Sequence, residues 1–428
     1  MSMATFNIIT MGCSKNSVDS EVIAAKLKSQ GSSVLFESVQ NTDYVIINTC
    51  GFIGDAKEES INEILIHLER KKAGDVKKVF VIGCLSERYK DELIESLPEA
   101  DGIYGFKDLN HFLNDPQFDL LQSPDRILST PSHYAYMKVS EGCDRECSYC
   151  AIPLIRGKQI SKPIDLLVSE AQKLSSQGVK ELILIAQDLT YYGIDISGKR
   201  DLEPLLRRLA STEGLEWIRL HYAYPIGFPY EILDVMNEYS NICKYIDIPL
   251  QHVSDQILQS MRRGGNSAQN YKLIETMRNK VPGIAIRTSL ITGYPTETRK
   301  EHKELVQFVK DMRFERLGVF TYSPEENTPA FPLGDPVSQK EKNRRQEELL
   351  SVQNEIAYLQ NQEKIGSVMR VLIDDLDGDF YIGRTEFDSP EVDNIVLIDK
   401  NEKPLEIGTF QPVYIEDAGA YELIGKVI

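Results

Sequence analysis

Three cysteines in one short loop are the residues of this chain best suited to do chemistry. Cys143, Cys147 and Cys150 are separated by three and then two residues in the segment EGCDRECSYC. Three thiolates at this spacing can hold three irons of a four-iron cluster and leave the fourth iron without a protein ligand. Zinc is the simpler alternative, but a structural zinc site favours four ligands, and no further Cys or His follows in this loop. The spacing therefore predicts an iron–sulfur cluster with an open, catalytic iron.

The same loop resembles that of the radical SAM superfamily, which has the spacing C-x3-C-x2-C and usually an aromatic residue before the last cysteine, here Tyr149. The resemblance implies a [4Fe-4S] cluster whose open iron binds S-adenosylmethionine and, when reduced, cleaves it to a deoxyadenosyl radical. The cofactor would supply the reactive species, while the protein would position the reactants and exclude water. We therefore expect no side chain to act as a catalytic acid or base in hydrogen abstraction.

Four residues are candidate contacts for S-adenosylmethionine. Tyr149 adjoins the last cysteine of the loop. In the superfamily, a Gly-Gly-Glu segment at the end of the second barrel strand often meets the amino group of the cofactor, and here the segment ends in Gln187 and Asp188. These two residues keep polar atoms at the strand end, although turn and helix-cap roles are equally compatible with them. Arg287 is a candidate partner for the cofactor carboxylate, with a structural ion pair as the alternative.

Three more cysteines, Cys13, Cys50 and Cys84, each follow a β-rich run, and a glycine adjoins each of them. The carboxyl ends of parallel strands lie along one edge of a sheet, where such sheets gather ligands. The glycines would let the backbone pass close to a bulky inorganic centre. The pattern favours a second cluster over the alternative of three buried core cysteines. Cys243 has no partner by spacing and is predicted to be a core residue.

The composition indicates what kind of protein positions these cysteines. A chain of 428 residues argues for about three domains, and 42% hydrophobic with 26% charged residues is typical of soluble globular proteins. The 48 basic and 65 acidic residues give a net charge of −17, which argues against general nucleic-acid binding. The sequence lacks a basic signal-peptide region and any run of about 18 apolar residues, so we expect a cytoplasmic protein without membrane contact.

The first third of the chain alternates β-rich runs with helix-compatible segments, which predicts a parallel α/β domain over residues 1–120. Strands are expected at 6–13, 44–52 and 79–85. A helix is expected to begin with Asp55 as its N-cap. The stretch rich in Pro, Asp and Ser from about 115 to 131 predicts a linker.

A second domain is predicted over residues 131–362, where six strand-like runs alternate with helical segments. This alternation predicts a βα-barrel, partial or closed, with ligands at the carboxyl ends of its strands. A capping box from Ser338 to Glu341 opens a trailing helix that is expected to run to about Lys364. The six runs cover residues 133–142, 180–188, 216–225, 245–253, 284–293 and 316–324.

Residues 363–428 contain five shorter β-rich runs, which predict a small all-β barrel. From Val371 to the last residue this tail has four basic and fourteen acidic residues, a net charge of −10. More than half of the negative excess of the chain is therefore in the tail.

With both cysteine sets and the tail considered together, the chain from about Phe6 to its end resembles the radical SAM methylthiotransferases. That family joins an N-terminal cluster domain, a radical SAM partial barrel and a C-terminal, OB-like TRAM barrel. One S-adenosylmethionine would methylate sulfur attached to the auxiliary cluster, and a second would yield the radical that removes hydrogen from the substrate carbon. The resemblance also implies an electron donor such as a flavodoxin or ferredoxin. It implies two [4Fe-4S] clusters, with Cys13, Cys50 and Cys84 as ligands of the auxiliary one and Cys143, Cys147 and Cys150 as ligands of the other.

The family divides into members that modify adenosine in tRNA and members that modify the β-carbon of an aspartate in small-subunit ribosomal protein twelve. Members that act on tRNA typically carry Gly-Cys-Gln-Met-Asn, whereas this chain has Gly-Cys-Ser-Lys-Asn at 12–16, which resembles the ribosomal-protein branch. The segments AIPLIRGK and GRTEFDSPEVDN resemble the same branch. The negative charge of the tail would repel RNA and attract a basic protein partner. The alternative is that this acidic surface serves only to keep the protein soluble. Methylthiolation of tRNA, sulfur insertion into a small molecule and an iron–sulfur sensor without turnover are the alternatives.

Overall fold

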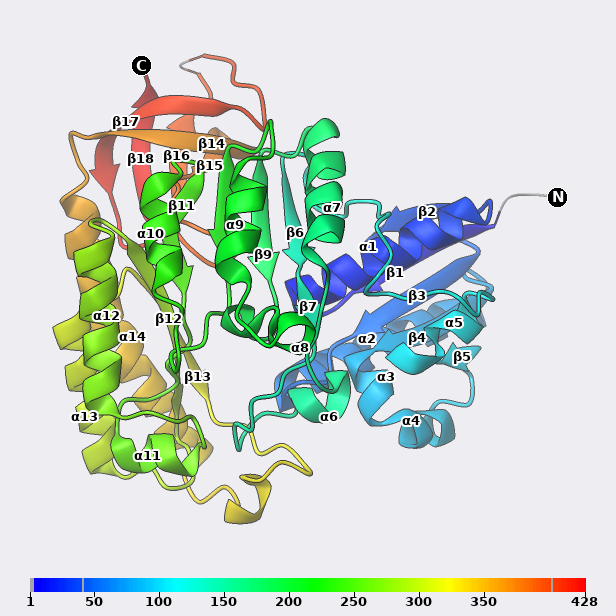
Figure 1. Cartoon of the computed structure of the whole chain (residues 1–428). Coiled ribbons are helices and arrows are strands. Elements are labelled where there is room, and N and C mark those ends of the chain that lie inside the picture. Colours follow the sequence, from blue (N-terminus) through cyan, green and yellow to red (C-terminus); the bar gives the residue numbers. More distant parts are fainter. Residues whose placement is uncertain (1–3, 41, 402) are drawn as a thin grey trace.

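The structure of the protein is a computed structural model that describes residues 4–40, 42–401 and 403–428. Three parts follow one another along the chain: an α/β sheet, a larger parallel sheet with helices, and a small β-barrel (Figure 1). This architecture confirms the predicted fold class. Within the described residues, no helix combines the length and the apolar character that a membrane span requires.

The N-terminal sheet has five parallel strands in the order β2-β1-β3-β4-β5. Its central strands carry fully buried β-branched residues such as Ile46 and Val81, which favour a strand covered on both faces. The sequence predicts these three central strands but not the edge strands β2 and β5, which are too short to show a pattern. The strands are β1 (Thr5–Thr10), β2 (Ser33–Phe36), β3 (Tyr44–Thr49), β4 (Lys78–Gly83) and β5 (Gly102–Ile103).

Helices cover both faces of the N-terminal sheet. Ile23 of α1 packs with Ile8 and Ile46 on one face, and Ile64 of α2 packs with Ile47 on the other. This two-sided packing leaves the carboxyl edge of the sheet, where the cysteines are, as the place where the loops meet. The helices are α1 (Ser14–Ser29), α2 (Gly54–Ala73), α3 (Cys84–Arg88), α4 (Lys90–Ser96) and α5 (Leu109–Phe112), with a 3₁₀ turn at Phe106–Asp108.

The predicted start of α2 is wrong by a small shift. The helix begins at Gly54, and its N-cap residue is Ile53, whose side chain makes no capping hydrogen bond. Asp55 lies in the first turn instead, where its negative charge interacts favourably with the helix N-terminus. A carboxylate near a helix start thus stabilises this helix without capping it.

The second sheet has six parallel strands in the order β13-β12-β11-β10-β9-β6, so it is an open partial barrel. All six predicted strands are present. A pair of two-residue strands, β7 (Ser140–Glu141) and β8 (Ile160–Ser161), follows β6 and pairs antiparallel. The six main strands are β6 (Tyr134–Lys138), β9 (Glu181–Ile185), β10 (Trp217–Leu220), β11 (Ile242–Asp247), β12 (Ala285–Thr292) and β13 (Arg316–Thr321).

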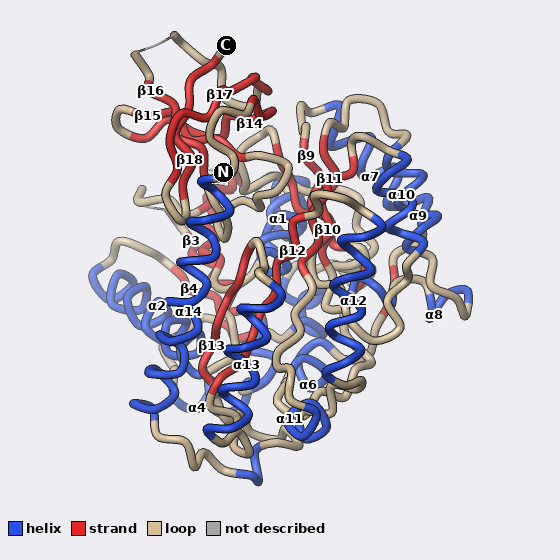
Figure 2. The backbone as a smooth tube through the Cα atoms, turned by 90° about the vertical axis from the view of Figure 1, so that its left-hand side faces the viewer, coloured by secondary structure: helices blue, strands red, loops and turns tan. Residues whose placement is uncertain are grey.

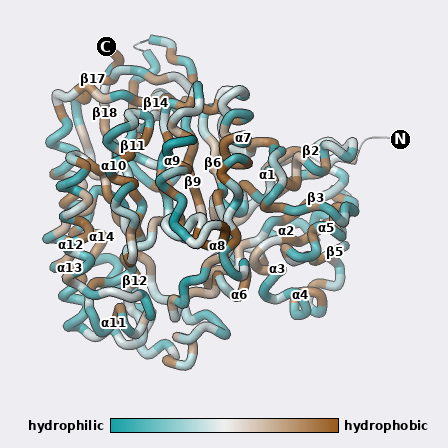
Figure 3. Tube along the Cα trace, viewed as in Figure 1, coloured by the Kyte–Doolittle hydropathy of each residue, from teal (hydrophilic) through white to brown (hydrophobic). Residues whose placement is uncertain are grey.

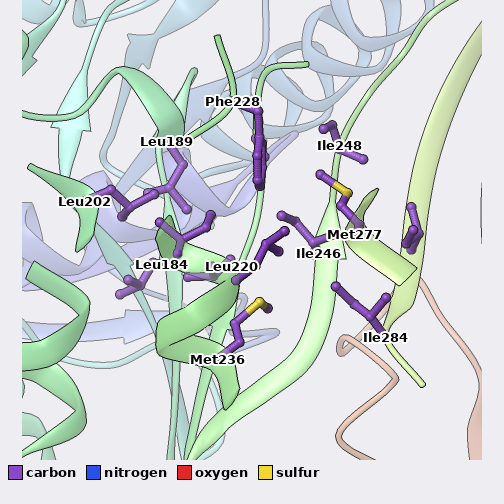
Figure 4. Close-up of a cluster of buried hydrophobic side chains, with 14 of the residues drawn as sticks. Leu184, Leu189, Leu202, Leu220, Phe228, Met236, Ile246, Ile248, Met277 and Ile284 are labelled. Atoms are coloured by element: carbon purple, nitrogen blue, oxygen red, sulfur yellow. The ribbon is translucent and has the colours of Figure 1, made fainter. Parts of the chain in front are cut away.

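The main hydrophobic core lies between this sheet and its helices. Alternate strand residues such as Leu184, Leu220 and Ile246 point toward Met236 and Met277 of the covering helices (Figure 4). The helices alternate hydrophilic and hydrophobic residues along their length, as amphipathic helices on a sheet do (Figure 3). They are α7 (Ile164–Ser176), α9 (Leu202–Ala210), α10 (Glu231–Glu238), α12 (Ser267–Lys280) and α13 (Arg299–Met312).

Shorter elements connect the strands at the carboxyl edge, and one long helix leads out of this part. The long helix α14 (Gln339–Gln362) begins as predicted, with the Ser338 hydroxyl accepting a hydrogen bond from the Glu341 amide. The connecting elements are α6 (Ile152–Arg156), α8 (Ile194–Ser197), α11 (Asp255–Ser260) and 3₁₀ turns at Leu189–Tyr191 and Phe331–Leu333.

The tail forms the predicted five-stranded barrel, which is closed in the order β14-β15-β16-β18-β17. It packs against the second sheet at one end of the molecule, and Figure 2 shows it from a second direction. Cys243 is buried there with Trp217 and Leu372, as expected of a core residue. The strands are β14 (Val368–Asp377), β15 (Phe380–Arg384), β16 (Ile395–Asp399), β17 (Phe410–Ala418) and β18 (Glu422–Val427).

The loop 385–394 between β15 and β16, here called the tail loop, contacts the second sheet through buried polar groups. Asp393 pairs with Arg287 at 2.7 Å and accepts a hydrogen bond from Tyr245, and Asp388 pairs with Arg316. Part of the acidic excess of the tail therefore faces inward. Asp374 likewise pairs with Arg384 and His133, so the net charge of the tail overstates the negative charge that it presents to solvent.

The segment 115–131 contains no helix or strand among the residues that the structure describes, yet it is held in place along α1. The Ile127 amide donates to the Glu21 carbonyl, and the Ser129 amide and hydroxyl donate to the Glu21 carboxylate at 2.9 Å. Arg126 adds ion pairs to Glu21 and Glu170. These contacts tie the N-terminal sheet to α7 of the second part.

Candidate functional site

The loop of the second cysteine set begins at the carboxyl end of β6. The β7–β8 pair closes the base of the loop, and Gly142 has a φ of +76°, at a point where a side chain would collide with the Lys158 carbonyl. The Cys143 amide donates to the Gly157 carbonyl at 3.1 Å. The loop conformation is therefore fixed by local backbone contacts.

Of the three cysteines of this loop, Cys147 is buried, and Cys143 and Cys150 are half-buried. Burial raises the pKa of Cys143 to about 11 and that of Cys150 to about 12. The Arg263 guanidinium donates to the Cys147 sulfur at 3.4 Å and stacks on the ring of Tyr224. A metal centre that takes these groups as thiolates would supply the compensating positive charge, with Arg263 adding to it at Cys147.

Tyr149 packs into a hydrophobic cluster with Met261 and Tyr294, and the neighbouring Ser148 anchors the loop through hydrogen bonds to the carbonyls of α11 and its end. Burial raises the pKa of Tyr149 well above the usual tyrosine value. The ring thus wedges the loop against α11, a role compatible with a nearby cofactor.

Gln187 and Asp188 lie at the carboxyl end of β9, beside this loop. The Gln187 amide donates to Glu141 at 2.5 Å. Asp188 is buried and accepts a hydrogen bond from Arg145, which lies between the first two cysteines of the loop. The two candidate contacts are therefore part of the same group of side chains as the cysteine loop.

Arg287 is placed differently from the other candidates. Its guanidinium pairs with Asp393 of the tail loop at 2.7 Å and lies 3.9 Å from Asp247. The guanidinium of Arg287 thus has carboxylate partners within the chain, as expected if Arg287 forms a structural ion pair and does not bind the cofactor carboxylate.

The first cysteine set comes together at the carboxyl edge of the N-terminal sheet. Cys13, Cys50 and Cys84 follow β1, β3 and β4, which are neighbours in the sheet. A Cβ on Gly12 would lie 2.8 Å from the Cys50 sulfur, and one on Gly51 would lie 2.8 Å from the Cys84 carbonyl carbon. The glycines are thus required for the close approach of the three loops.

Asn16 joins these loops to one another. Its amide nitrogen donates to the carbonyls of Met11 and Thr49 at 2.9 and 3.1 Å, and its oxygen lies 3.6 Å from the Cys84 sulfur. Burial raises the pKa of Cys50 to about 12 and also raises that of Cys84. One buried side chain therefore holds three chain segments and faces a thiol.

The donor chemistry fits iron–sulfur clusters better than a single ion. Within the described ranges, no three His, Cys, Asp or Glu side chains are placed to hold one metal ion. Two trios of thiols agree with the preference of iron–sulfur clusters for soft sulfur ligands.

A buried ionic network joins Cys84 of the first cysteine set to the segment that follows the second set. Arg156, at the end of α6 just beyond the second set, donates to the Cys84 sulfur of the first set at 3.3 Å and to Asn16 at 2.6 Å. It also pairs with Asp19 and Glu141 at 2.7 and 2.9 Å. Cys84 of the first set also packs with Ala151, the residue that follows Cys150 of the second set, so the two sets approach each other where the first two parts of the molecule meet.

Sequence reasoning did not assign a role to Arg156, Arg263 or Asn16. Arg156 and Asn16 lie in the segments AIPLIRGK and GCSKN, which differ between branches, but only the docking of the two parts brings them together. A cavity of about 470 Å³ opens beside this junction and is lined by Phe106, Leu154 and Arg156. None of the six cysteines lines this cavity.

Comparisons with known families follow this division of the chain. Residues 5–105 match UPF0004, described as an uncharacterized protein family, residues 137–309 match the radical SAM superfamily, and residues 365–428 match the TRAM domain. The fold and the cysteine loop thus define a radical SAM enzyme, and membership in that superfamily implies a [4Fe-4S] cluster and S-adenosylmethionine.

Relatives named ribosomal protein uS12 methylthiotransferase RimO match along nearly the whole chain. The protein of Christiangramia forsetii is 51% identical over 98% of this chain and 93% of its own length. That of Cytophaga hutchinsonii is 50% identical over 99% and 97%, and that of Bacteroides fragilis is 49% identical over the full length of both. The chain therefore belongs to the family of ribosomal protein uS12 methylthiotransferases.

Solved structures share the fold at low identity. The radical S-adenosylmethionine methyltransferase TsrM from Kitasatospora setae, with cobalamin and a [4Fe-4S] cluster bound, superposes with a TM-score of 0.55 at 14% identity over 77% of each chain. The cobalamin-dependent enzyme OxsB superposes with a TM-score of 0.51 at 13% identity over 82% of this chain and 56% of that chain. These likenesses concern the fold alone.

Proposed function

We propose that this protein transfers a methylthio group to the β-carbon of an aspartate in ribosomal protein uS12, with S-adenosylmethionine as both methyl donor and radical source. The observation that carries the proposal is the contact of Arg156, which follows the second cysteine set, with the Cys84 sulfur of the first set. Full-length relatives near 50% identity that bear this activity in their name support it. We further propose the domain boundaries 1–120, 131–362 and 363–428.

In this proposal each trio holds one [4Fe-4S] cluster. When bound, the clusters and S-adenosylmethionine supply the electron, the radical and the methylated sulfur. The protein holds Cys147 beside Arg263 and Cys84 beside Arg156, so that each trio faces one buried guanidinium. These positive charges stabilise clusters that carry net negative charge.

Gln187, Asp188 and Tyr149 are the proposed neighbours of S-adenosylmethionine. The first two present polar atoms at the strand end next to the cysteine loop, while Tyr149 holds the loop against α11. Arg287 is left out of this set because Asp393 already satisfies its charge. The rings of Tyr191 and Tyr224, which stack on Arg145, help to exclude water from the region beside the cysteine loop.

The substrate protein and the electron donor complete the proposal. The exposed acids of the tail, such as Asp375 and Asp377, offer a negative surface to a basic ribosomal protein. A flavodoxin or ferredoxin would deliver the electron to the cluster of the second trio.

The test uses the full chain, reconstituted with iron and sulfide without oxygen, then mixed with reductant, S-adenosylmethionine and purified uS12. Mass spectrometry of uS12 should show a methylthio group in place of one hydrogen on an aspartate. Bulk tRNA treated in parallel and digested to nucleosides should show no methylthioadenosine product. Modified tRNA with unmodified uS12 would overturn the proposal.

A further inference from the structure

Lys15 has a placement that the steps above leave unexplained. It lies two residues after Cys13, at the start of α1, and it is only 8% exposed. Its side chain crosses from the N-terminal part to the second sheet, where the ammonium nitrogen lies 3.2 Å from the centroid of the Tyr222 ring. Tyr222 follows β10, so this contact is at the carboxyl edge of the sheet.

The ammonium of Lys15 lacks an anionic partner. Among the residues that the structure describes, its side chain makes no hydrogen bond and no ion pair. The other buried lysines differ: Lys138 pairs with Asp19 and Glu141, Lys162 with Glu170, and Lys342 with Asp335. A largely buried cation is costly unless it is paired, and a ring face compensates for only part of that cost. Lys15 is therefore ready to accept an anion.

Tyr222, whose ring faces Lys15, has a strained backbone conformation. Tyr222 has a φ of +62°, which is unfavourable for a residue with a side chain, and its amide donates to Asp247 at 3.2 Å. Gln251, beyond the end of the neighbouring strand β11, has a φ of +70°. Strain of this kind at adjacent strand ends is typical of binding sites.

Asp247 is a carboxylate whose charge interacts with Lys15, although the two form no ion pair, and its Oδ1 makes no hydrogen bond within the described residues. Its Oδ2 accepts a hydrogen bond from the Tyr222 amide, and the Arg287 guanidinium lies 3.9 Å from its Oδ1. Burial raises its pKa to about 6, with Arg287 and Lys15 opposing that rise. Asp247 thus orients Tyr222 and leaves the Lys15 ammonium without a direct contact.

We propose that Lys15 is a specificity residue that binds the side-chain carboxylate of the substrate aspartate, and that the Tyr222 ring supports the ammonium until substrate arrives. The inference rests on the proposed function, in which the reacting carbon is the β-carbon of an aspartate. That carbon is bonded directly to the carboxylate, so binding the carboxylate fixes the C–H bond in space. A charge-assisted hydrogen bond to a buried ammonium favours aspartate over uncharged analogues.

The first experiment needs no variant protein. Peptides of uS12 that cover the modified aspartate, carrying either Asp or Asn at that position, are titrated into the reconstituted wild-type enzyme with S-adenosylmethionine and no reductant. We expect the Asp peptide to bind roughly tenfold or more tightly than the Asn peptide, the scale of one charged hydrogen bond. Equal affinity of the two peptides would overturn the proposal.

The second experiment changes the lysine. Lys15→Met keeps the length and removes the charge, Lys15→Arg keeps the charge, and Lys28→Met is the control, since Lys28 is exposed on the same helix. Lys15→Met should lose the preference for the Asp peptide, Lys15→Arg should keep part of it, and the control should keep all of it. Iron content and release of deoxyadenosine without substrate should stay at wild-type values in all three.

The outcomes separate this inference from the proposed function. If the wild-type enzyme modifies uS12 and Lys15→Met still prefers the Asp peptide, only the role of Lys15 is wrong. If Lys15→Met loses iron or deoxyadenosine release, Lys15 serves a cluster or cofactor and the inference is likewise overturned. If the wild-type enzyme leaves uS12 unmodified, the proposed function itself fails.

Discussion

The two cysteine trios are assembled in opposite ways. Cys143, Cys147 and Cys150 lie within one loop that local contacts close, including the β7–β8 pair and the turn at Gly142. The other trio is drawn from three loops, each after a different strand, and depends on sheet order and on Asn16. A local site tolerates disturbance of the rest of the fold, whereas a site built from distant segments needs the whole sheet in place.

The largest expected effect comes from removing one trio at a time. Replacing Cys143, Cys147 and Cys150 by Ala should leave about four irons of about eight and abolish cleavage of S-adenosylmethionine. Replacing Cys13, Cys50 and Cys84 by Ala should also leave about four irons but retain cleavage and end methylthio transfer. Iron analysis and deoxyadenosine release measure both. Loss of all iron in the first variant would contradict the independence of the two sites.

Arg156→Met should have the next largest effect, because it leaves Asp19 and Glu141 buried with one cation fewer. Breaking a buried ionic network of this kind costs about 3 to 5 kcal/mol in free energy of unfolding. The loss of a positive charge beside Cys84 should also lower the reduction potential of the auxiliary cluster and leave that of the other cluster nearly unchanged. Thermal unfolding and potentiometric titration followed by electron paramagnetic resonance measure these effects.

The control for Arg156 is Arg344→Met, which removes an exposed guanidinium paired with Glu341 and Glu348. Exposed pairs contribute at most about 1 kcal/mol, so this variant should behave like the wild type. Equal shifts of both cluster potentials in Arg156→Met would indicate that Arg156 acts on the whole junction and not on one trio.

Asn16→Ala should weaken only the trio that is built from distant segments. It removes the hydrogen bonds to Met11 and Thr49 and leaves buried carbonyls without donors, at about 1 to 3 kcal/mol. We expect auxiliary iron to be lost faster to a chelator, with cleavage of S-adenosylmethionine unchanged. Asn343→Ala on the exposed side of α14 is the matched control. Equal chelation rates in the two variants would contradict the dependence on Asn16.

The smallest effect is expected at the cysteine that belongs to neither trio. Cys243→Ala removes one small buried group from the contact with Trp217 and Leu372, which should cost about 1 kcal/mol. Iron content should equal that of the wild type. A selective loss of iron in this variant would show that Cys243 is more than a packing residue.

The sequence predicted the elements that repeat a local pattern, including the three central strands of the first sheet, the six of the second, the start of α14 and the barrel of the tail. It missed the edge strands β2 and β5, which are short, and it misplaced the cap of α2. The sequence also indicated a role for each of the seven cysteines, because the spacing of cysteines and their position after predicted strands are local signals.

The sequence did not indicate how the three parts dock, and the polar residues of the junction depend on that docking. Arg156 and Lys15 each belong to one part by sequence but act in another part, on Cys84 and Tyr222. The inward-facing acids Asp388 and Asp393 were counted as surface charge for the same reason. Contacts between distant segments leave no periodicity in a single sequence.

The tail loop has a consequence for exchanging parts between related enzymes. Asp388 and Asp393 neutralise Arg316 and Arg287, which would otherwise be cations facing an open end of the partial barrel. A chimera that takes its tail from another protein must therefore import matching acids in this loop or lose the arginines as well. The TRAM barrel and the radical SAM sheet are thus expected to be inherited and engineered as one unit.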